Sequence, residues 1–141
     1  MNSVILECTE TAHMKVLIID DDKFIRNLFI SELTQENFVV ITAPEGVSGV
    51  ELIKSEKPDV VVLDLLLPGL DGFGVLEAVK KLPDDVRAHI ALFVFSSLGQ
   101  EHDREEALAL GATGYFPKDH ATVRKVIDAI RERDAHSSTK T

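Results

Sequence analysis

Five short apolar runs, rich in β-branched residues, recur along this 141-residue chain and limit what it can fold into. None of them alternates apolar with polar residues, which favours strands buried on both faces, as in a parallel sheet. Helical spacing appears between the runs; Ile25, Leu28 and Phe29, for example, stand at i, i+3 and i+4. The alternation predicts an α/β fold, a doubly wound five-stranded parallel sheet flanked by five helices. The runs are residues 15–19, 38–42, 59–63, 90–95 and 113–116.

One domain accounts for the whole pattern. We expect it to cover residues 14–134, with residues 1–13 as a mobile N-terminal extension and residues 135–141 as a mobile C-terminal tail. The sequence PDDVR, which begins at Pro83, is typical of a surface loop. Further helices are expected within residues 44–55, 73–81, 100–110 and 123–130.

Composition argues against several classes of function. The formal net charge of −9 argues against nucleic-acid binding, which needs clustered Lys and Arg. No apolar stretch approaches the ~20 residues that span a membrane. A single cysteine, Cys8, excludes an internal disulfide and a cysteine-rich metal site. These features predict a cytoplasmic protein that binds neither nucleic acid nor membrane.

Polar residues follow four of the five runs. Asp20, Asp21 and Asp22 come directly after the first run, and Asp64 follows the third. The fourth run is followed by Ser96 and the fifth by Lys118. In a parallel sheet the carboxyl ends of the strands meet at one edge, where ligands bind in folds of this class. We therefore expect these side chains to form one site.

The grouped carboxylates predict a metal. Two carboxylates ~4 Å apart repel by ~4 kcal/mol at an effective dielectric constant near 20, and a bound dication removes that conflict. Oxygen ligands without His or Cys suit Mg²⁺, or Mn²⁺ in its place. Asp64 stands between two leucines, without an adjacent acid. A carboxylate fixed beside a metal can attack a phosphoryl group to form an acyl phosphate.

Four stretches of the chain carry a family resemblance: VLIIDDDKFIR, DVVVLDLLLPGLDG, FVFSS and GATGYFPKD. In order and spacing they resemble the receiver domain of two-component response regulators, in particular the single-domain, CheY-like members. The resemblance extends over roughly residues 14–134. It implies a flavodoxin-like fold with the strand order 2-1-3-4-5.

The resemblance also implies roles for individual residues. Asp64 matches the phosphoacceptor, and Asp20 and Asp21 match the acid pair that holds Mg²⁺ together with it. Leu66, two residues after the acceptor, matches the position whose backbone carbonyl completes the metal site.

Three further positions match the family's catalytic and switch residues. Lys118 and Ser96 match the lysine and the hydroxyl residue that contact the phosphoryl group. Ser96 and Tyr115 match the pair that rearranges in the active state. The surface expected to change with them is formed by residues 100–110 and 113–116.

The implied function is a stand-alone receiver that takes a phosphoryl group from a phosphohistidine donor. That donor would be a sensor histidine kinase or a histidine phosphotransfer protein. We expect no enzyme activity beyond the domain's own phosphorylation and dephosphorylation. With no room for an output domain after residue 134, the signal is expected to go to a downstream protein or to be relayed onward; a homodimer is left open.

Three other functions compete with this interpretation. A phosphorylation-independent interaction module would leave a gap in the acid pocket, and none is found. An aspartate-dependent phosphatase would need a DxD acceptor pair where this chain has DDD followed by Lys23. A flavin carrier would need a phosphate loop rich in glycine and hydroxyl groups after the first strand.

Smaller expectations concern caps, histidines and one departure from the family. Asp22 and Asp71 each precede a helical segment and are expected to cap it. The five histidines show no ligand spacing and are expected to be solvated. Lys118 is followed by Asp119 rather than by the proline, in a cis bond, that is usual in the family. We therefore leave the shape of this loop open and expect Asp119 to add negative charge near the site.

Overall fold

The five apolar runs form five parallel strands of one sheet in the computed structural model, which describes residues 14–139. Their spatial order is β2-β1-β3-β4-β5, which confirms the predicted topology. No strand end differs from its predicted position by more than one residue. The strands are β1 (Lys15–Ile19), β2 (Val39–Ala43), β3 (Val60–Leu63), β4 (Ala91–Ser96) and β5 (Gly114–Pro117).

Six helices, one more than predicted, surround the sheet in the described part of the chain. The additional helix is α5, which replaces the expected surface loop after Pro83. Asp84 and Asp85 lie in its first turn and Arg87 and His89 in its last, which complements the helix dipole. The same charged residues had indicated a loop. The helices are α2 (Lys23–Thr34), α3 (Gly46–Glu56), α4 (Gly72–Lys80), α5 (Asp84–His89), α6 (Glu101–Ala109) and α7 (His120–Thr139).

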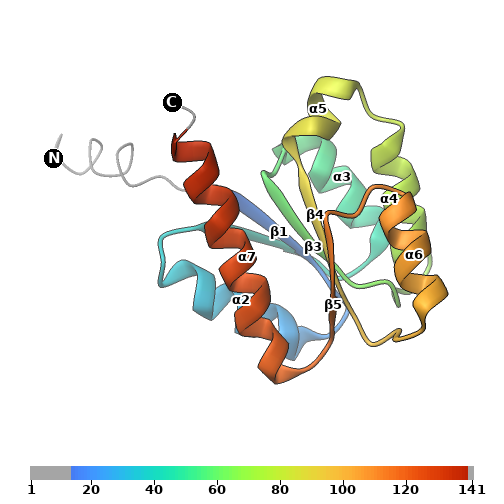
Figure 1. Ribbon diagram of the computed structural model, residues 1–141, viewed down its shortest axis with the longest axis horizontal. Helices are drawn as coiled ribbons and strands as arrows, with labels where there is room; N and C mark the ends of the chain where they lie inside the picture. The colour runs from blue at the N-terminus through green and yellow to red at the C-terminus, as the bar shows by residue number, and fades with distance from the viewer. Residues whose placement is uncertain (1–13, 140–141) are drawn as a thin grey trace, which may run out of the picture.

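The helices cover both faces of the sheet (Figure 1). Helices α2 and α7 pack on one face, where the rings of Phe29 and Phe95 meet edge to face at 5.5 Å. Helices α3, α4 and α6 pack on the other face, around side chains such as Ile53 and Leu76. Because both faces are covered, strands β3 and β4 are buried along their whole length. This explains why the apolar runs show no alternation.

Two predicted caps are present and fix the loops beside the sheet edge. Asp22 Oδ1 accepts hydrogen bonds from the backbone N–H groups of Phe24 at 2.9 Å and Ile25 at 3.4 Å, at the start of α2. Asp71 accepts one from Gly74 N at 2.9 Å, at the start of α4. Both helices therefore begin directly after the loops that carry the acidic residues.

The structure describes the C-terminal end of the expected domain but not the segment that precedes its N-terminal end. The predicted N-terminal extension, residues 1–13, lies outside the described residues. Helix α7 continues to Thr139, beyond residue 134, where the sequence analysis placed the end of the domain. The mobility of the C-terminal tail stays a prediction. Within residues 14–139, no helix is both long and apolar enough to cross a membrane.

Candidate functional site

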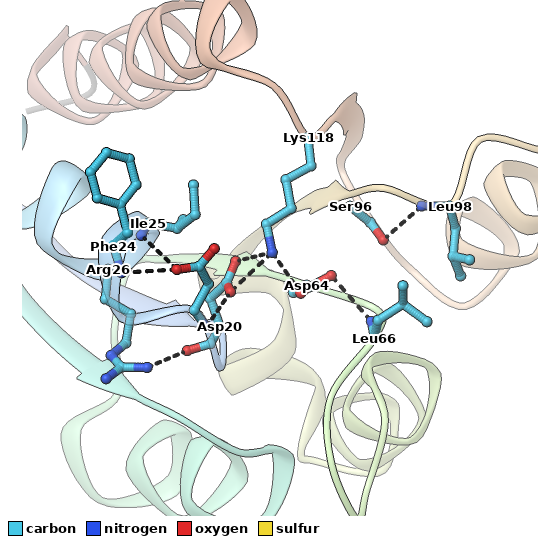
Figure 2. Close-up of polar contacts among 10 residues, drawn as sticks. Asp20, Phe24, Ile25, Arg26, Asp64, Leu66, Ser96, Leu98 and Lys118 are labelled. Atoms are coloured by element: carbon cyan, nitrogen blue, oxygen red, sulfur yellow. Dashed lines mark hydrogen bonds and ion pairs between the residues drawn. The ribbon is translucent and has the colours of Figure 1, made fainter.

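The carboxyl ends of β1, β3, β4 and β5 bring four predicted residues to one edge of the sheet (Figure 2). Asp20 follows β1 and Asp64 follows β3, and these strands pair in register, with Ile19 opposite Leu63. Ser96 ends β4, and its carbonyl accepts a hydrogen bond from Lys118 N at 2.9 Å. Backbone pairing therefore sets the positions of all four residues.

Lys118 joins the two buried acids. Its Nζ lies 3.0 Å from Asp20 Oδ1 and 2.9 Å from Asp64 Oδ2, and both carboxylates are almost fully buried. Burial by itself lowers the pKa of the Lys118 ammonium. The hydrogen bonds to Asp64 and Asp20 outweigh this effect, so that the pKa is raised overall. The lysine is therefore a charged group held between the proposed acceptor and a proposed metal ligand.

Asp20 is the most perturbed acid of the site. Burial, the largest cause, raises the pKa of its carboxyl from 3.8 to about 6. The backbone N–H of Asp22 (2.9 Å) and the Lys118 ammonium lower the pKa in part, and the charge of Asp64 raises it further. Burying a carboxylate without a full set of counter-charges disfavours its ionised form. The Lys118 ammonium therefore only partly offsets the burial of the Asp20 carboxylate.

A residue that the sequence analysis missed also supports Asp20. Arg26 Nη1 donates a hydrogen bond of 2.9 Å to the Asp20 backbone carbonyl (Figure 2). The contact depends on how the chain turns from β1 into α2, and no motif marks such a turn. Arg26 thereby ties the first turn of α2 to the acidic loop.

Three carboxylates are close enough to share a metal. Asp20, Asp21 and Asp64 each offer one oxygen, and these oxygens lie within 4.8 Å of one another. Asp20 and Asp64 are buried, whereas Asp21 is exposed at the mouth of the site. A donor set made only of carboxylate oxygens, open to water on one side, fits Mg²⁺, which keeps several waters in its coordination shell. The cluster thus agrees with the predicted metal site.

Leu66 contacts Asp64 through its backbone. Its N–H donates a hydrogen bond of 3.1 Å to Asp64 Oδ1, and its side chain is 49% exposed at the rim of the site. The use of its carbonyl as a metal ligand stays a prediction.

Ser96 and Tyr115 both bind Leu98, a relation that the sequence analysis did not find. The Leu98 N–H donates to Ser96 Oγ at 3.2 Å, and the Tyr115 hydroxyl donates to the Leu98 carbonyl. Burial is the main cause of the raised pKa of the Tyr115 phenol, and the charges of Asp103 and Asp64 add to it. Tyr115 therefore keeps its phenol proton and remains a hydrogen-bond donor. The two predicted switch residues hold opposite ends of one residue in the β4–α6 loop.

Asp119 has a structural role after Lys118. Its Oδ1 accepts hydrogen bonds from the backbone N–H and the hydroxyl of Thr122, both at 2.8 Å, at the start of α7. No peptide bond is cis between residues 14 and 139, so the Lys118–Asp119 bond is trans. The extra negative charge is thus engaged by the first turn of a helix.

Two of the histidines expected to be solvated have acidic neighbours. His89 Nε2 lies 2.5 Å from Asp59 Oδ1, and His102 Nε2 lies 3.3 Å from Asp103 Oδ1. Both side chains are more than half exposed, as expected of solvated residues, but the contacts with Asp59 and Asp103 were not predicted.

A family model described as "Response regulator receiver domain" matches residues 16–131. The chain belongs to this family. Receiver domains are signalling modules of two-component systems, so the resemblance seen in the sequence is confirmed.

Curated relatives agree with this assignment. The chemotaxis protein CheY of Halobacterium salinarum is 36% identical over 118 residues, which cover 84% of this chain and 94% of that protein. The probable transcriptional regulator ycf27 of Guillardia theta is 38% identical over 104 residues, which cover 74% of this chain but 39% of that protein. The chain thus matches only about two fifths of the length of the ycf27 relative.

Solved structures show the same fold. The response regulator domain of Thermotoga maritima CheB is 27% identical with a TM-score of 0.75, over 87% of this chain and 97% of that one. A receiver domain from Francisella, response regulator 1452, reaches a TM-score of 0.78 at 24% identity, over 88% of this chain and 98% of that one, and supports the fold alone. The CheX–CheY–BeF3–Mg²⁺ complex of Borrelia burgdorferi matches at 28% identity with a TM-score of 0.72, over 83% and 88% of the two chains.

Proposed function

We propose that this receiver domain accepts a phosphoryl group on Asp64 from a phosphohistidine donor in a Mg²⁺-dependent reaction. The observation that carries the proposal is the arrangement around Lys118, whose ammonium bridges the buried Asp20 and Asp64 while Asp21 lies within metal-sharing distance. Asp20, Asp21, Asp64 and the Leu66 carbonyl would hold the ion, which supplies charge neutralisation for the transferring group.

The transfer follows from the position of Asp64. One of its carboxylate oxygens attacks the phosphorus, and the bond from phosphorus to the imidazole nitrogen of the donor breaks. The bonding electron pair returns to that nitrogen. Lys118 and the Leu66 N–H, which already contact the two Asp64 oxygens, fix the carboxylate and offset the negative charge of the incoming group. The protein contributes positioning and electrostatic stabilisation.

The switch would begin at Ser96. A phosphoryl group adds about −1.5 to −2 charge and three acceptor oxygens. When the Ser96 hydroxyl turns to donate to one of them, it gives up the hydrogen bond that Leu98 N now makes to it. Leu98 also holds the Tyr115 hydroxyl, so release of the loop lets Tyr115 move into the space that Ser96 leaves. The surface of α6, β5 and α7 changes with it.

Energetically, the switch needs only a few interactions. Moving a two-state equilibrium from 1:99 to 99:1 takes about 5.5 kcal/mol of differential stabilisation. Hydrogen bonds to a charged group contribute about 1.5–3 kcal/mol each. Two or three such bonds to the phosphoryl group, from Ser96, Lys118 and the backbone, are therefore of the right order.

The partners in this proposal are a sensor histidine kinase or a histidine phosphotransfer protein as donor, and a downstream protein or a relay histidine as recipient. Support for the Mg²⁺ requirement comes from the Borrelia CheY relative, whose structure was solved with BeF3 and Mg²⁺. The acidic charge and the single cysteine support a cytoplasmic location without nucleic-acid binding. The rival function is a receiver-like module that binds its partner without phosphorylation.

The two functions are distinguished by NMR of the ¹⁵N-labelled protein with Mg²⁺ and beryllofluoride, a phosphoryl mimic. We expect new amide positions at Leu66, Leu98 and Tyr115 in the wild type and no change in Asp64→Asn. In Ser96→Ala, the shift at Leu66 should persist while the shifts at Leu98 and Tyr115 shrink. If the wild-type spectrum were unchanged by the mimic, the phosphorylation-independent module would be favoured.

A further inference from the structure

A pocket lies at the amino end of β4, away from the proposed phosphoacceptor. Its volume is about 410 Å³, within the range of roughly 300–1,000 Å³ typical of small-molecule sites. It lies between α4, α5 and the end of α6, which gather on one side of the molecule in Figure 1. The unexpected helix α5 supplies part of its wall. Its lining residues are Val79, Lys80, Asp84, Arg87, Ala88, Ile90, Leu92, Ala109, Leu110 and Gly111.

Much of the lining is apolar and fixed. Val79, Ile90 and Leu92 are buried members of the core that also contains α3 and α4. Leu110 packs against the same cluster from the end of α6. These side chains form an apolar wall, and a ligand body that covers it would bind more tightly because apolar surface is removed from water.

Arg87 adds a charged group to this apolar wall. Its Nη2 donates to Asp84 Oδ1, which anchors the guanidinium within α5. Its Nε is buried and has no hydrogen-bond acceptor among the described residues. The Arg87 side chain as a whole is 38% exposed, so part of it remains open to an acceptor supplied by a ligand. The anchored guanidinium is therefore a prearranged acceptor-binding group.

The net charge of the lining favours an anionic ligand. Lys80 and Arg87 are cationic and only Asp84 is acidic, so the lining is net positive in a chain whose formal net charge is −9. A local positive charge on an acidic protein attracts anions to that place. Inorganic phosphate alone would leave the apolar wall uncovered, which favours an anion with an apolar body.

We propose that this pocket binds a small organic acid, with its carboxylate on Arg87 and Lys80 and its apolar body against Val79, Ile90 and Leu92. The proposal does not depend on phosphorylation of Asp64, because the pocket shares no residue with the phosphoacceptor site.

The test is an NMR titration of the ¹⁵N-labelled full chain with 4-phenylbutyrate as the probe. We expect saturable shifts at the amides of Val79, Arg87 and Leu110. The neutral analogue 4-phenyl-1-butanol should bind at least about tenfold more weakly, since it lacks the charge-assisted hydrogen bond. Inorganic phosphate should cause no saturable shift at these amides. Equal binding of acid and alcohol, or no saturable shift with the acid, would overturn the proposal.

Two variants test the two halves of the pocket. Arg87→Lys keeps the cation but replaces the planar guanidinium with a single ammonium, and it should weaken 4-phenylbutyrate binding by about tenfold or more. Arg104→Lys, the matched control on the exposed part of α6, should leave binding unchanged. Ala109→Phe fills the pocket from an exposed position and should abolish binding while the amide spectrum of β1 and β3 stays in place. Wild-type affinity in both Arg87→Lys and Ala109→Phe would contradict the assigned site.

Discussion

The buried carboxyl of Asp20 binds a proton more readily in the folded protein than in the unfolded chain. Because burial raises the pKa of its carboxyl from 3.8 to about 6, the folded chain holds a proton that the unfolded chain has released. Its contribution is therefore fully present below pH 3.8 and is lost as the pH rises to about 6. The difference corresponds to about 3 kcal/mol at 1.36 kcal/mol per pKa unit.

Asp20→Asn should remove this dependence. The amide carries no charge, and its oxygen can still accept the hydrogen bond from Asp22 N. In EDTA, urea unfolding of the wild type should show a fall in the free energy of unfolding between pH 4 and pH 6 that the variant lacks. At pH 7 the variant should be more stable than the wild type by up to about 3 kcal/mol. An equal pH slope in both proteins would show that Asp20 is not the group responsible.

At the scale of the element, the DDD triplet divides between two tasks. Asp20 and Asp21 belong to the acidic cluster, whereas Asp22 caps α2. Asp22→Ala should lower the free energy of unfolding by about 1 kcal/mol, because two N–H groups at the start of α2 lose their acceptor.

Asp22→Asn is the matched control for the cap. It keeps a side-chain oxygen in the capping position and should remain within a few tenths of a kcal/mol of the wild type in urea unfolding. Both variants should accept a phosphoryl group with Mg²⁺, since Asp22 is not part of the cluster. A loss of phosphorylation in a folded Asp22→Ala would assign this residue to the site instead.

The start of α4 packs against the backbone of Asp64, the proposed phosphoacceptor. A Cβ at Gly72 would lie 2.5 Å from the Asp64 carbonyl oxygen and 2.5 Å from Leu65 Cα, so the β3–α4 loop must shift to accommodate it. Gly72→Ala should therefore lower the free energy of unfolding by about 1–3 kcal/mol and slow the phosphorylation of Asp64.

Gly99 is the matched position for this test. A Cβ there meets nothing within 4 Å, and Gly99 lies in the loop after β4. Gly99→Ala should be close to the wild type in urea unfolding and in phosphorylation rate. Comparable losses in the two variants would mean that close packing on Asp64 is not the cause.

At the scale of the whole molecule, local patterns predicted the sheet and the residues at its edge. The central strands are buried on both faces, so an unbroken apolar run is enough to predict a strand. Parallel pairing then brings Asp20 and Lys118 together across 98 positions of sequence. The family motifs supplied the roles expected of Ser96, Tyr115 and Leu66.

The rest depended on contacts that no local pattern encodes. Arg26 reaches the Asp20 carbonyl through the geometry of one turn, and Leu98 links Ser96 to Tyr115 through its backbone, where side-chain identity gives no signal. Helix α5 was missed because six residues give too little helical periodicity, and its charges also suit a loop. The pocket that it forms with α4 and α6 was invisible for the same reason.

Phosphorylation of Asp64 is the central claim, and the intact mass of the protein tests it most directly. After incubation with Mg²⁺ and a small phosphodonor such as acetyl phosphate, the wild type should gain the mass of one phosphoryl group. The adduct should survive mild acid but be lost in base, as expected of an acyl phosphate. The gain should be absent in Asp64→Asn and in EDTA. An adduct of undiminished amount on Asp64→Asn, or none on the wild type with Mg²⁺, would contradict the account.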